Sequence, residues 1–122
     1  MKIGVSATGK DLNAIVDQRF GRCSCFLIID SDTMDFEFIS NESAMSSGGA
    51  GIQAAQTVAK AGVDVVVTGN MGPNAFQTLS AAGIKVFTGA NGTIKEAIEK
   101  YKKGELEETE APNLGSHSGL RR

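Results

Sequence analysis

The sequence predicts an α/β fold in which a mixed sheet of five strands, the second of them antiparallel, is combined with three helices in three layers. The first part of the chain indicates a strand, a polar loop and a hairpin, whereas residues 50–103 alternate between helix-spaced and strand-like apolar runs joined by short glycine-containing loops. Such alternation is typical of parallel strands connected by right-handed crossovers. A chain of 122 residues is expected to form one domain with one core.

Three strands are predicted before residue 41. The run KIGVSA (2–7) indicates a short buried strand, and residues 10–22 indicate a polar loop. The apolar run CFLIID (25–30) and the alternating run FEFIS (36–40) are separated by the turn-like SDTMD, so a β-hairpin is expected. Because its second strand has a polar face, we place that strand at the edge of the sheet.

The remaining elements follow a regular order after a loop rich in serine and glycine at 41–49. A helix is expected from residue 50 to a stop at Gly62, then a strand at 63–68, a helix from Pro73 to Ala82, a strand at 84–88 and a helix from Thr93 to Lys103. Proline at 73 is well tolerated because it falls in the first turn of a helix. Residues 1–104 would form the domain, and the acidic, then small and polar, residues 105–122 a flexible tail.

The topology brings the glycine-rich loops to one edge of the sheet. If the first strand lies parallel to the fourth at the centre, with the hairpin antiparallel beside it, all three helices begin at the edge where the first, fourth and fifth strands end. Ligands of open α/β sheets bind at this edge, where the strand order reverses. Unpaired N–H groups of three helix N-termini, together with Arg19 and Arg22, predict an anionic ligand there.

Composition excludes several classes of partner. Residues 1–104 carry equal numbers of basic and acidic side chains, and the tail glutamates bring the net charge to −2, so the basic stripe of a nucleic-acid-binding protein is missing. No apolar run approaches a membrane span, and the N-terminus lacks the apolar centre of a signal peptide. We therefore expect a cytoplasmic protein with reduced thiols and no membrane partner.

Both cysteines follow the basic loop RFGR. If Cys23 and Cys25 were both in an extended strand, their sulfurs would face the same object, and Arg19 and Arg22 would favour the thiolate form that binds metals. Soft thiolates select iron–sulfur units, copper(I) or zinc, although two cysteines cannot complete a zinc site by themselves. The alternative for Cys25 is a plain buried side chain. Further soft or imidazole ligands would have to come from three other positions: Met45, Met71 and His117.

Catalytic signatures are missing. There is no phosphate-binding G-x-x-x-x-G-K-[ST] motif and no G-x-G-x-x-G after the first strand, and GSHSG (115–119) has His at the nucleophile position with no strand before it. The topology suits a ribonuclease H-like sheet, but its first strand holds no carboxylate for Mg²⁺. Because Asp11 and Asp17 are interpreted as solvated loop charges, we expect a binding protein and not an enzyme.

Several motifs in order closely resemble the nitrogenase iron–molybdenum cofactor biosynthesis family: RFGRC, GGAGIQAAQ, GVDVVVTGNMGPNAF, GIKVFTG and YKKGEL, over roughly residues 1–108. The resemblance implies a ribonuclease H-like three-layer fold without nuclease activity and an anionic ligand based on iron and sulfur. The chain has Cys23 where the family commonly has alanine, and no histidine in its body. The positions that match the family's loops are Arg19, Phe20, Gly21, Arg22, Gly48, Gly49, Gly51, Thr68, Gly69, Asn70 and Gly72.

The leading hypothesis is a non-enzymatic carrier or storage protein for an iron–sulfur cluster or an iron–molybdenum cofactor precursor. Arg19, Arg22 and the glycine-rich rim with Gly48, Gly49, Gly69 and Asn70 would bind it, and the metal ligands would be Cys23, Cys25 and His117. The alternatives are a module for a small phosphorylated or nucleotide ligand, with structural cysteines, and a protein-interaction scaffold. Expected partners are the cluster and cluster-assembly or acceptor proteins, and the chain would be a monomer or a weak homodimer.

Overall fold

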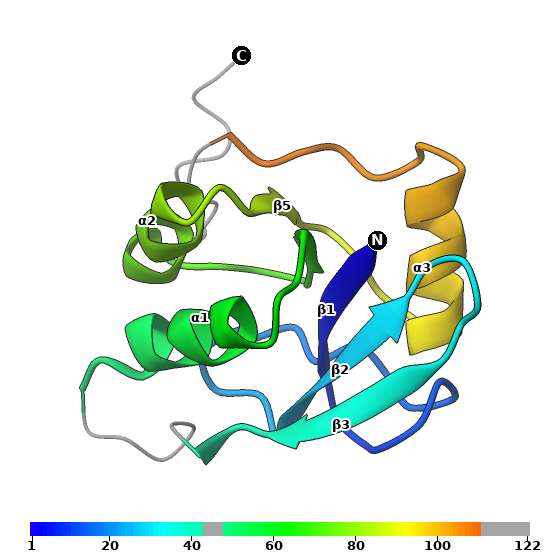
Figure 1. The fold of residues 1–122 in the computed structure, drawn as a ribbon, viewed down its shortest axis with the longest axis horizontal. Helices are drawn as coiled ribbons and strands as arrows, with labels where there is room; N and C mark the ends of the chain where they lie inside the picture. Colours follow the sequence, from blue (N-terminus) through cyan, green and yellow to red (C-terminus); the bar gives the residue numbers. More distant parts are fainter. Residues whose placement is uncertain (43–47, 111–122) are drawn as a thin grey trace.

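A computed structural model describes residues 1–42 and 48–110 of the chain (Figure 1). All eight predicted elements are present, and their bounds lie within two residues of those expected. Their order is β1 (Lys2–Ala7), β2 (Cys25–Asp30), β3 (Phe36–Ser40), α1 (Ala50–Lys60), β4 (Val65–Val67), α2 (Pro73–Ala81), β5 (Lys85–Phe87) and α3 (Ile94–Lys102).

The strands form one open mixed sheet in the order β3-β2-β1-β4-β5. β1 pairs antiparallel with β2 and parallel with β4, with Ile3 opposite Val65 and Val5 opposite Val67. The α/β prediction, including the central parallel pair and the antiparallel hairpin, is therefore confirmed. The ends of β1, β4 and β5, the start of β2 and the end of β3 lie along the same edge.

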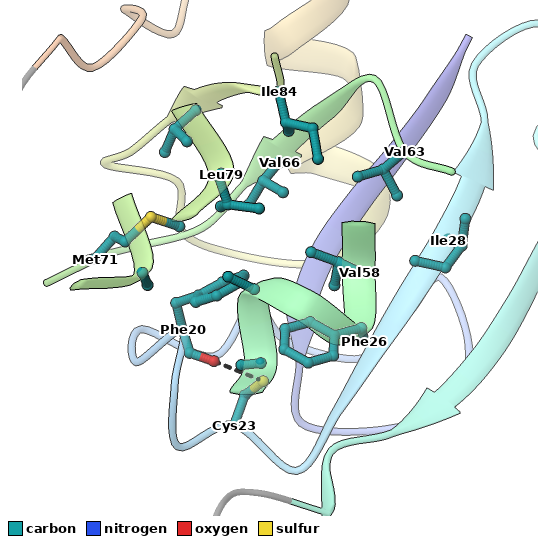
Figure 2. Close-up of a cluster of buried hydrophobic side chains, with 14 residues drawn as sticks. Phe20, Cys23, Phe26, Ile28, Val58, Val63, Val66, Met71, Leu79 and Ile84 are labelled. Atoms are coloured by element: carbon teal, nitrogen blue, oxygen red, sulfur yellow. Dashed lines mark hydrogen bonds between the residues drawn. The ribbon is translucent and has the colours of Figure 1, made fainter. Parts of the chain in front are cut away.

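Successive side chains of each strand enter two separate cores. Phe26 and Ile28 of β2 and Val66 of β4 pack under α1 and α2, whereas Leu27 and Ile29 pack under α3. The helices accordingly cover opposite faces of the sheet and give three layers, as Figure 1 shows, and Figure 2 shows the core under α1 and α2. None of the described helices is long and apolar enough to cross a bilayer.

The start of the expected flexible tail is attached to the sheet. Thr109 N–H donates to the Val86 carbonyl at 2.7 Å, the hydroxyls of Thr88 and Thr109 lie 2.6 Å apart, and Phe87 forms an antiparallel bridge with Glu108. The tail prediction is therefore corrected for residues 105–110, because backbone pairing with β5 is independent of the acidic composition on which the prediction relied. The rest of that tail, with His117, lies outside the described residues.

The two faces of the hairpin give a test of the core. Replacing Phe26, which is fully buried, by alanine removes an entire ring from the α1/α2 core and is expected to lower the free energy of unfolding by about 3–5 kcal/mol. The matched variant Phe36→Ala, on the neighbouring strand at 42 % exposure, should cost less than about 1 kcal/mol. Urea unfolding at low protein concentration measures both; similar losses would contradict the assignment of Phe26 to the core.

Candidate functional site

Two helices begin at the carboxyl edge of the sheet with glycine at the N-cap position. The N-cap residues of α1 and α2 are Gly49 and Gly72, neither has a side-chain cap, and neither helix has an acidic residue in its first turn. The start of α3 differs, because Thr93 and Glu96 bond to each other's backbone N–H groups in a capping box. The prediction that three helix N-termini would serve an anion is thus corrected: α3 carries its own carboxylate, and α1 and α2 remain.

The loop between β1 and β2 is fastened to the loop that follows β4. Phe20 N–H donates to the Asn70 carbonyl at 3.3 Å, and Asn70 N–H donates to the Gln18 carbonyl at 2.8 Å. Gly69 makes this approach possible, because a Cβ atom there would lie 2.7 Å from Gln18 Cα. Gln18 Nε2 donates a hydrogen bond to the Ala90 carbonyl at 2.9 Å. Three of the loops that the sequence placed at one edge are therefore in direct contact.

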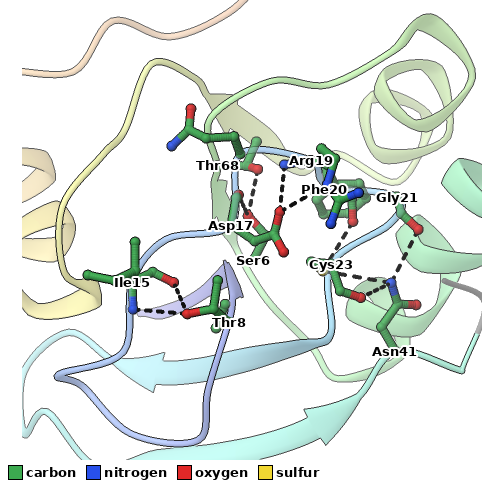
Figure 3. Close-up of polar contacts among 12 residues, drawn as sticks. Ser6, Thr8, Ile15, Asp17, Arg19, Phe20, Gly21, Cys23, Asn41 and Thr68 are labelled. Carbon is green, nitrogen blue, oxygen red and sulfur yellow. Dashed lines mark hydrogen bonds and ion pairs between the residues drawn. The ribbon is translucent and has the colours of Figure 1, made fainter.

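The same β1–β2 loop packs against the start of α1. A Cβ atom on Gly21 would lie 3.1 Å from Gly51 Cα, so the two backbones meet without side chains between them. Asn41, directly after β3, holds the loop from the other side: its Nδ2 donates to the carbonyls of Gly21 at 3.2 Å and Cys23 at 2.9 Å (Figure 3). This role of Asn41 has no signature in the sequence, because the residue lies in a loop of small polar residues.

Asp17 is a structural residue, and its interpretation as a solvated charge is wrong. It is 8 % exposed, and its Oδ1 accepts a hydrogen bond from Arg19 N–H at 3.0 Å and lies 3.5 Å from Arg19 Nε. Its carbonyl accepts from Ser6 Oγ at 2.7 Å, and that hydroxyl lies 2.7 Å from Thr68 Oγ1 (Figure 3). An aspartate that bonds backbone two residues later is an Asx turn, so the spacing of Asp17 and Arg19 was the available signal.

An apolar anchor lies beneath this loop. Phe20 is 2 % exposed, and its ring centroid lies 5.2 Å from that of Phe26 in the α1/α2 core (Figure 2). Met71 is 1 % exposed in the same core. The suggestion of Met71 as a soft ligand at the rim is therefore not supported, because its thioether packs inward, and Met45 lies outside the described residues.

The two cysteines do not face a common object. Cys23 lies in the α1/α2 core beside Phe26, whereas Cys25 lies in the α3 core with Leu27, and the two thiol groups are 0 % and 2 % exposed. The expectation that both sulfurs would point to one side is wrong, because β2 begins only at Cys25 and the alternation rule does not extend back to Cys23.

Burial disfavours ionisation of both thiols. Burial raises the pKa of Cys23 to about 12, with a further contribution from the Asp17 carboxylate, and burial also raises the pKa of Cys25. The S–H groups donate to main-chain carbonyls, Cys23 to Phe20 and Cys25 to Gly9, each at 3.2 Å. The predicted thiolate form is therefore corrected: burial is the largest influence on both pKa values, and the cation that lowers the pKa of Cys25 is Lys10 and not an arginine. Among residues 1–42 and 48–110, no group of three or more His, Cys, Asp or Glu side chains could hold a metal ion.

What the edge offers to a ligand is positive charge and backbone donors. The Arg19 side chain is 70 % exposed, and Arg22 also lies at the surface of the loop. Gly48, Gly49 and Asn70 are exposed as well, next to the starts of α1 and α2 or in the loop after β4. We call this set of residues the rim. Such an arrangement can hold an anion by charge and by N–H groups.

An α/β protein with an open mixed sheet and a glycine-rich carboxyl edge is the class that this fold and rim define. The chain belongs to the dinitrogenase iron–molybdenum cofactor family, whose model matches residues 1–104. The resemblance found in the motifs is thereby confirmed.

Solved structures and a curated sequence agree with this assignment. The apo form of the orange protein from Desulfovibrio gigas is 43 % identical, with a TM-score of 0.90 and coverage of 93 % of this chain and 96 % of that one. A solution structure from Thermotoga, described as a candidate NifB protein, is 34 % identical, with a TM-score of 0.81 and coverage of 94 % and 98 %. An uncharacterised protein of Methanocaldococcus jannaschii is 30 % identical over 101 residues, covering 80 % of this chain and 86 % of its own.

The close contact at Gly69 can be tested directly. Gly69→Ala forces a methyl group against the backbone of Gln18, so we expect the 18–20 loop to move and the protein to lose about 1–3 kcal/mol of stability. Gly48→Ala is the control, since no described atom lies within 4 Å of a Cβ there. Amide spectra and urea unfolding measure the result, and unchanged amide shifts of Phe20 and Asn70 in Gly69→Ala would contradict the contact.

The raised pKa of Cys23 predicts a loss of stability in alkali. Above pH 9 the unfolded thiol ionises while the buried thiol stays protonated up to about pH 12, so stability present below pH 9 is lost as the pH rises. One such group contributes a slope of up to about 1.4 kcal/mol per pH unit. The difference in unfolding free energy between wild type and Cys23→Ala should therefore shrink between pH 9 and pH 11. If the unfolding free energies of the two proteins changed in parallel with pH, Cys23 would have the same pKa in the folded and unfolded states, which would contradict the prediction.

Proposed function

We propose that this protein is a non-enzymatic binding and carrier protein for an anionic metal–sulfur cofactor, either an iron–sulfur cluster or an iron–molybdenum cofactor precursor, in the cytoplasm. The observation that carries the proposal is the convergence of Arg19, Arg22 and the glycine N-caps of α1 and α2 on one edge of the sheet. Membership of the dinitrogenase cofactor family supports it, as does a 43 % identical relative described as an apo form. The strand order is also compatible with the ribonuclease H-like classification.

The cofactor would be held by charge and backbone N–H groups, without cysteine ligands. Metal ligation requires thiolates, and in this fold it would require the Cys23 and Cys25 thiols to ionise at the cost of their burial and then to reach one ligand from opposite faces of the sheet. The guanidinium groups of Arg19 and Arg22 need no such change. A binding mode of this kind is reversible and depends on ionic strength, as suits a carrier.

Catalysis finds no support in the same residues. The Asp17 carboxylate is bonded to Arg19, and both cysteines are buried. A nucleophile or general base at the rim would need to be ionisable and accessible. The proposal is therefore a binding role.

A second candidate, a small phosphorylated ligand, is favoured by one observation. Helix N-termini next to arginine side chains are also the common sites for phosphate groups. A metal–sulfur cofactor contains iron and sulfide, whereas a phosphorylated ligand contains neither. Titration with each kind of ligand therefore separates the two candidates.

Binding can be followed by anaerobic titration with a synthetic tetranuclear iron–sulfur cluster carrying water-soluble thiolate ligands. We expect saturable binding that weakens with salt, and a loss of about tenfold in affinity or more when Arg19→Gln and Arg22→Gln are combined. The double variant Lys60→Gln with Lys100→Gln, at exposed positions in the last turns of α1 and α3, removes the same two charges away from the rim and should bind like wild type.

The cysteine variants and a phosphate series complete the experiment. Cys23→Ala and Cys25→Ala should retain cluster binding, since charge and backbone donors carry it. Loss of binding in folded cysteine variants would instead establish thiolate ligation. Shifts of rim amides with inorganic phosphate or ATP but not with the cluster would favour the phosphorylated ligand, and no response to any probe would leave the scaffold hypothesis.

A further inference from the structure

Asp17 places a negative charge next to the rim, although the proposed ligand is itself an anion. Its Oδ1 lies 3.5 Å from Arg19 Nε, and the residue is 8 % exposed (Figure 3). A carboxylate at this place weakens the attraction of the rim for every anion, because like charges repel. The rim is therefore not arranged for the tightest possible anion binding.

The structure of the loop requires an acceptor at position 17, but it does not require a charge. Asp17 Oδ1 accepts from Arg19 N–H at 3.0 Å in an Asx turn, and the side-chain oxygen of an asparagine forms the same turn. The ion pair adds little stability, because the Arg19 side chain is 70 % exposed and exposed pairs are weak. Neither the turn nor stability explains why residue 17 is charged.

The carboxylate of Asp17 is fixed in place. The Asp17 N–H donates to the Ser6 carbonyl at 2.9 Å, and the Asp17 carbonyl accepts from Ser6 Oγ at 2.7 Å, so the main chain is fastened to the end of β1. The hydrogen bond from Arg19 N–H to Oδ1 fixes the side chain as well. An exposed, flexible carboxylate could turn away from an approaching anion, whereas this one stays beside the rim.

The Arg19 guanidinium can bind an anion without leaving Asp17. Its contact with Asp17 uses Nε, and within residues 1–42 and 48–110 no hydrogen bond or ion pair involves its two Nη groups. These groups can donate parallel hydrogen bonds to one anion. An anion about 2.8 Å from an Nη atom would lie roughly 6 Å from the carboxylate, which is within the Debye length of about 8 Å at physiological ionic strength. Salt therefore screens the repulsion only in part.

The raised pKa values of the two cysteines agree with an Asp17 charge that acts beyond its ion pair. Burial is the largest cause of the raised pKa of Cys23 and of Cys25, and the Asp17 carboxylate contributes to both. The two thiols lie in different cores, so the field of the carboxylate extends to both faces of the sheet. A ligand at the rim is subject to the same field.

We propose that Asp17 determines the specificity of the rim: it disfavours compact, multiply charged anions such as phosphate, and it admits a cofactor whose charge is spread over many atoms. Repulsion by a fixed charge increases with the ligand charge and decreases with distance. A phosphate group concentrates up to about two charges in one small group, whereas a metal–sulfur cluster distributes its charge over several sulfur atoms. This inference rests on the proposed function, because it concerns the same rim.

The need for such a residue follows from the chemistry of the rim. Backbone N–H groups at helix starts and arginine side chains are also the usual partners of phosphate groups. Without a repulsive group, phosphate would compete with the cofactor for the same donors, and specificity often depends on a group that acts against the competitor. The Asp17 carboxylate supplies this repulsion, and it opposes the phosphorylated ligand more strongly than the cluster.

Uncharged variants that keep the turn test the proposal. Asp17→Asn and Asp17→Ser both retain an oxygen acceptor for Arg19 N–H, and unchanged amide shifts of Phe20 and Asn70 show that the loop is intact. In amide-shift titrations at constant ionic strength, we expect both variants to bind inorganic phosphate about fivefold or more tightly than wild type. The gain should be larger for pyrophosphate, whose charge is higher. Affinity for the synthetic cluster, from the anaerobic titration described above, should rise less than about twofold.

The control is Glu99→Gln, at an exposed position of α3, which also removes one negative charge and should bind every probe like wild type. Three results would overturn the proposal: unchanged phosphate affinity in both Asp17 variants, equal gains for phosphate and cluster, or the same gain in Glu99→Gln. If wild type did not bind the cluster while the Asp17 variants gained affinity for phosphate, the carrier function would be wrong, and the repulsion of phosphate by Asp17 would be supported.

Discussion

The close backbone contact between residues 18–20 and Gly69–Asn70 is the constraint on which the rim depends. It joins the long connection after β1 to the loop after β4, across the point where the strand order reverses. Since no side chain fits between the two backbones at Gly69, the loop takes one path, with Phe20 directed into the core. The positions of both arginines at the surface follow from that path.

The sequence allowed the elements and their order to be predicted because each carries its own local pattern. Alternation in FEFIS, the continuous run CFLIID and the glycine stops after the helices are short-range signals. The predictions that were wrong depended on tertiary contacts. They concerned which core each of Cys23 and Cys25 enters, the burial of Asp17, and the pairing of residues 105–110 with β5. The capping box of α3 is an exception, since the Thr93-x-x-Glu96 spacing is visible in the sequence and was not used.

Asp17 has opposing effects on the rim. It orders the loop by accepting the Arg19 N–H, yet its carboxylate also partly neutralises the Arg19 guanidinium and raises the pKa of the nearby Cys23 thiol. Electrostatic attraction for an anion is therefore moderate, and it is exerted at an exposed surface where salt screens it. In the proposed carrier role, such a site would release its anion as the ionic strength rises.

The strand-like segment at 107–110 has a consequence for where this fold can be cut. The family match ends at Gly104, but the hydrogen bond that closes the outer side of β5 comes from Thr109. A protein shortened at that match would lose the donor to the Val86 carbonyl and expose the outer backbone of β5. Exposed backbone at a sheet edge can pair with a strand of another molecule, so the segment with Glu108 and Thr109 shields this edge from aggregation.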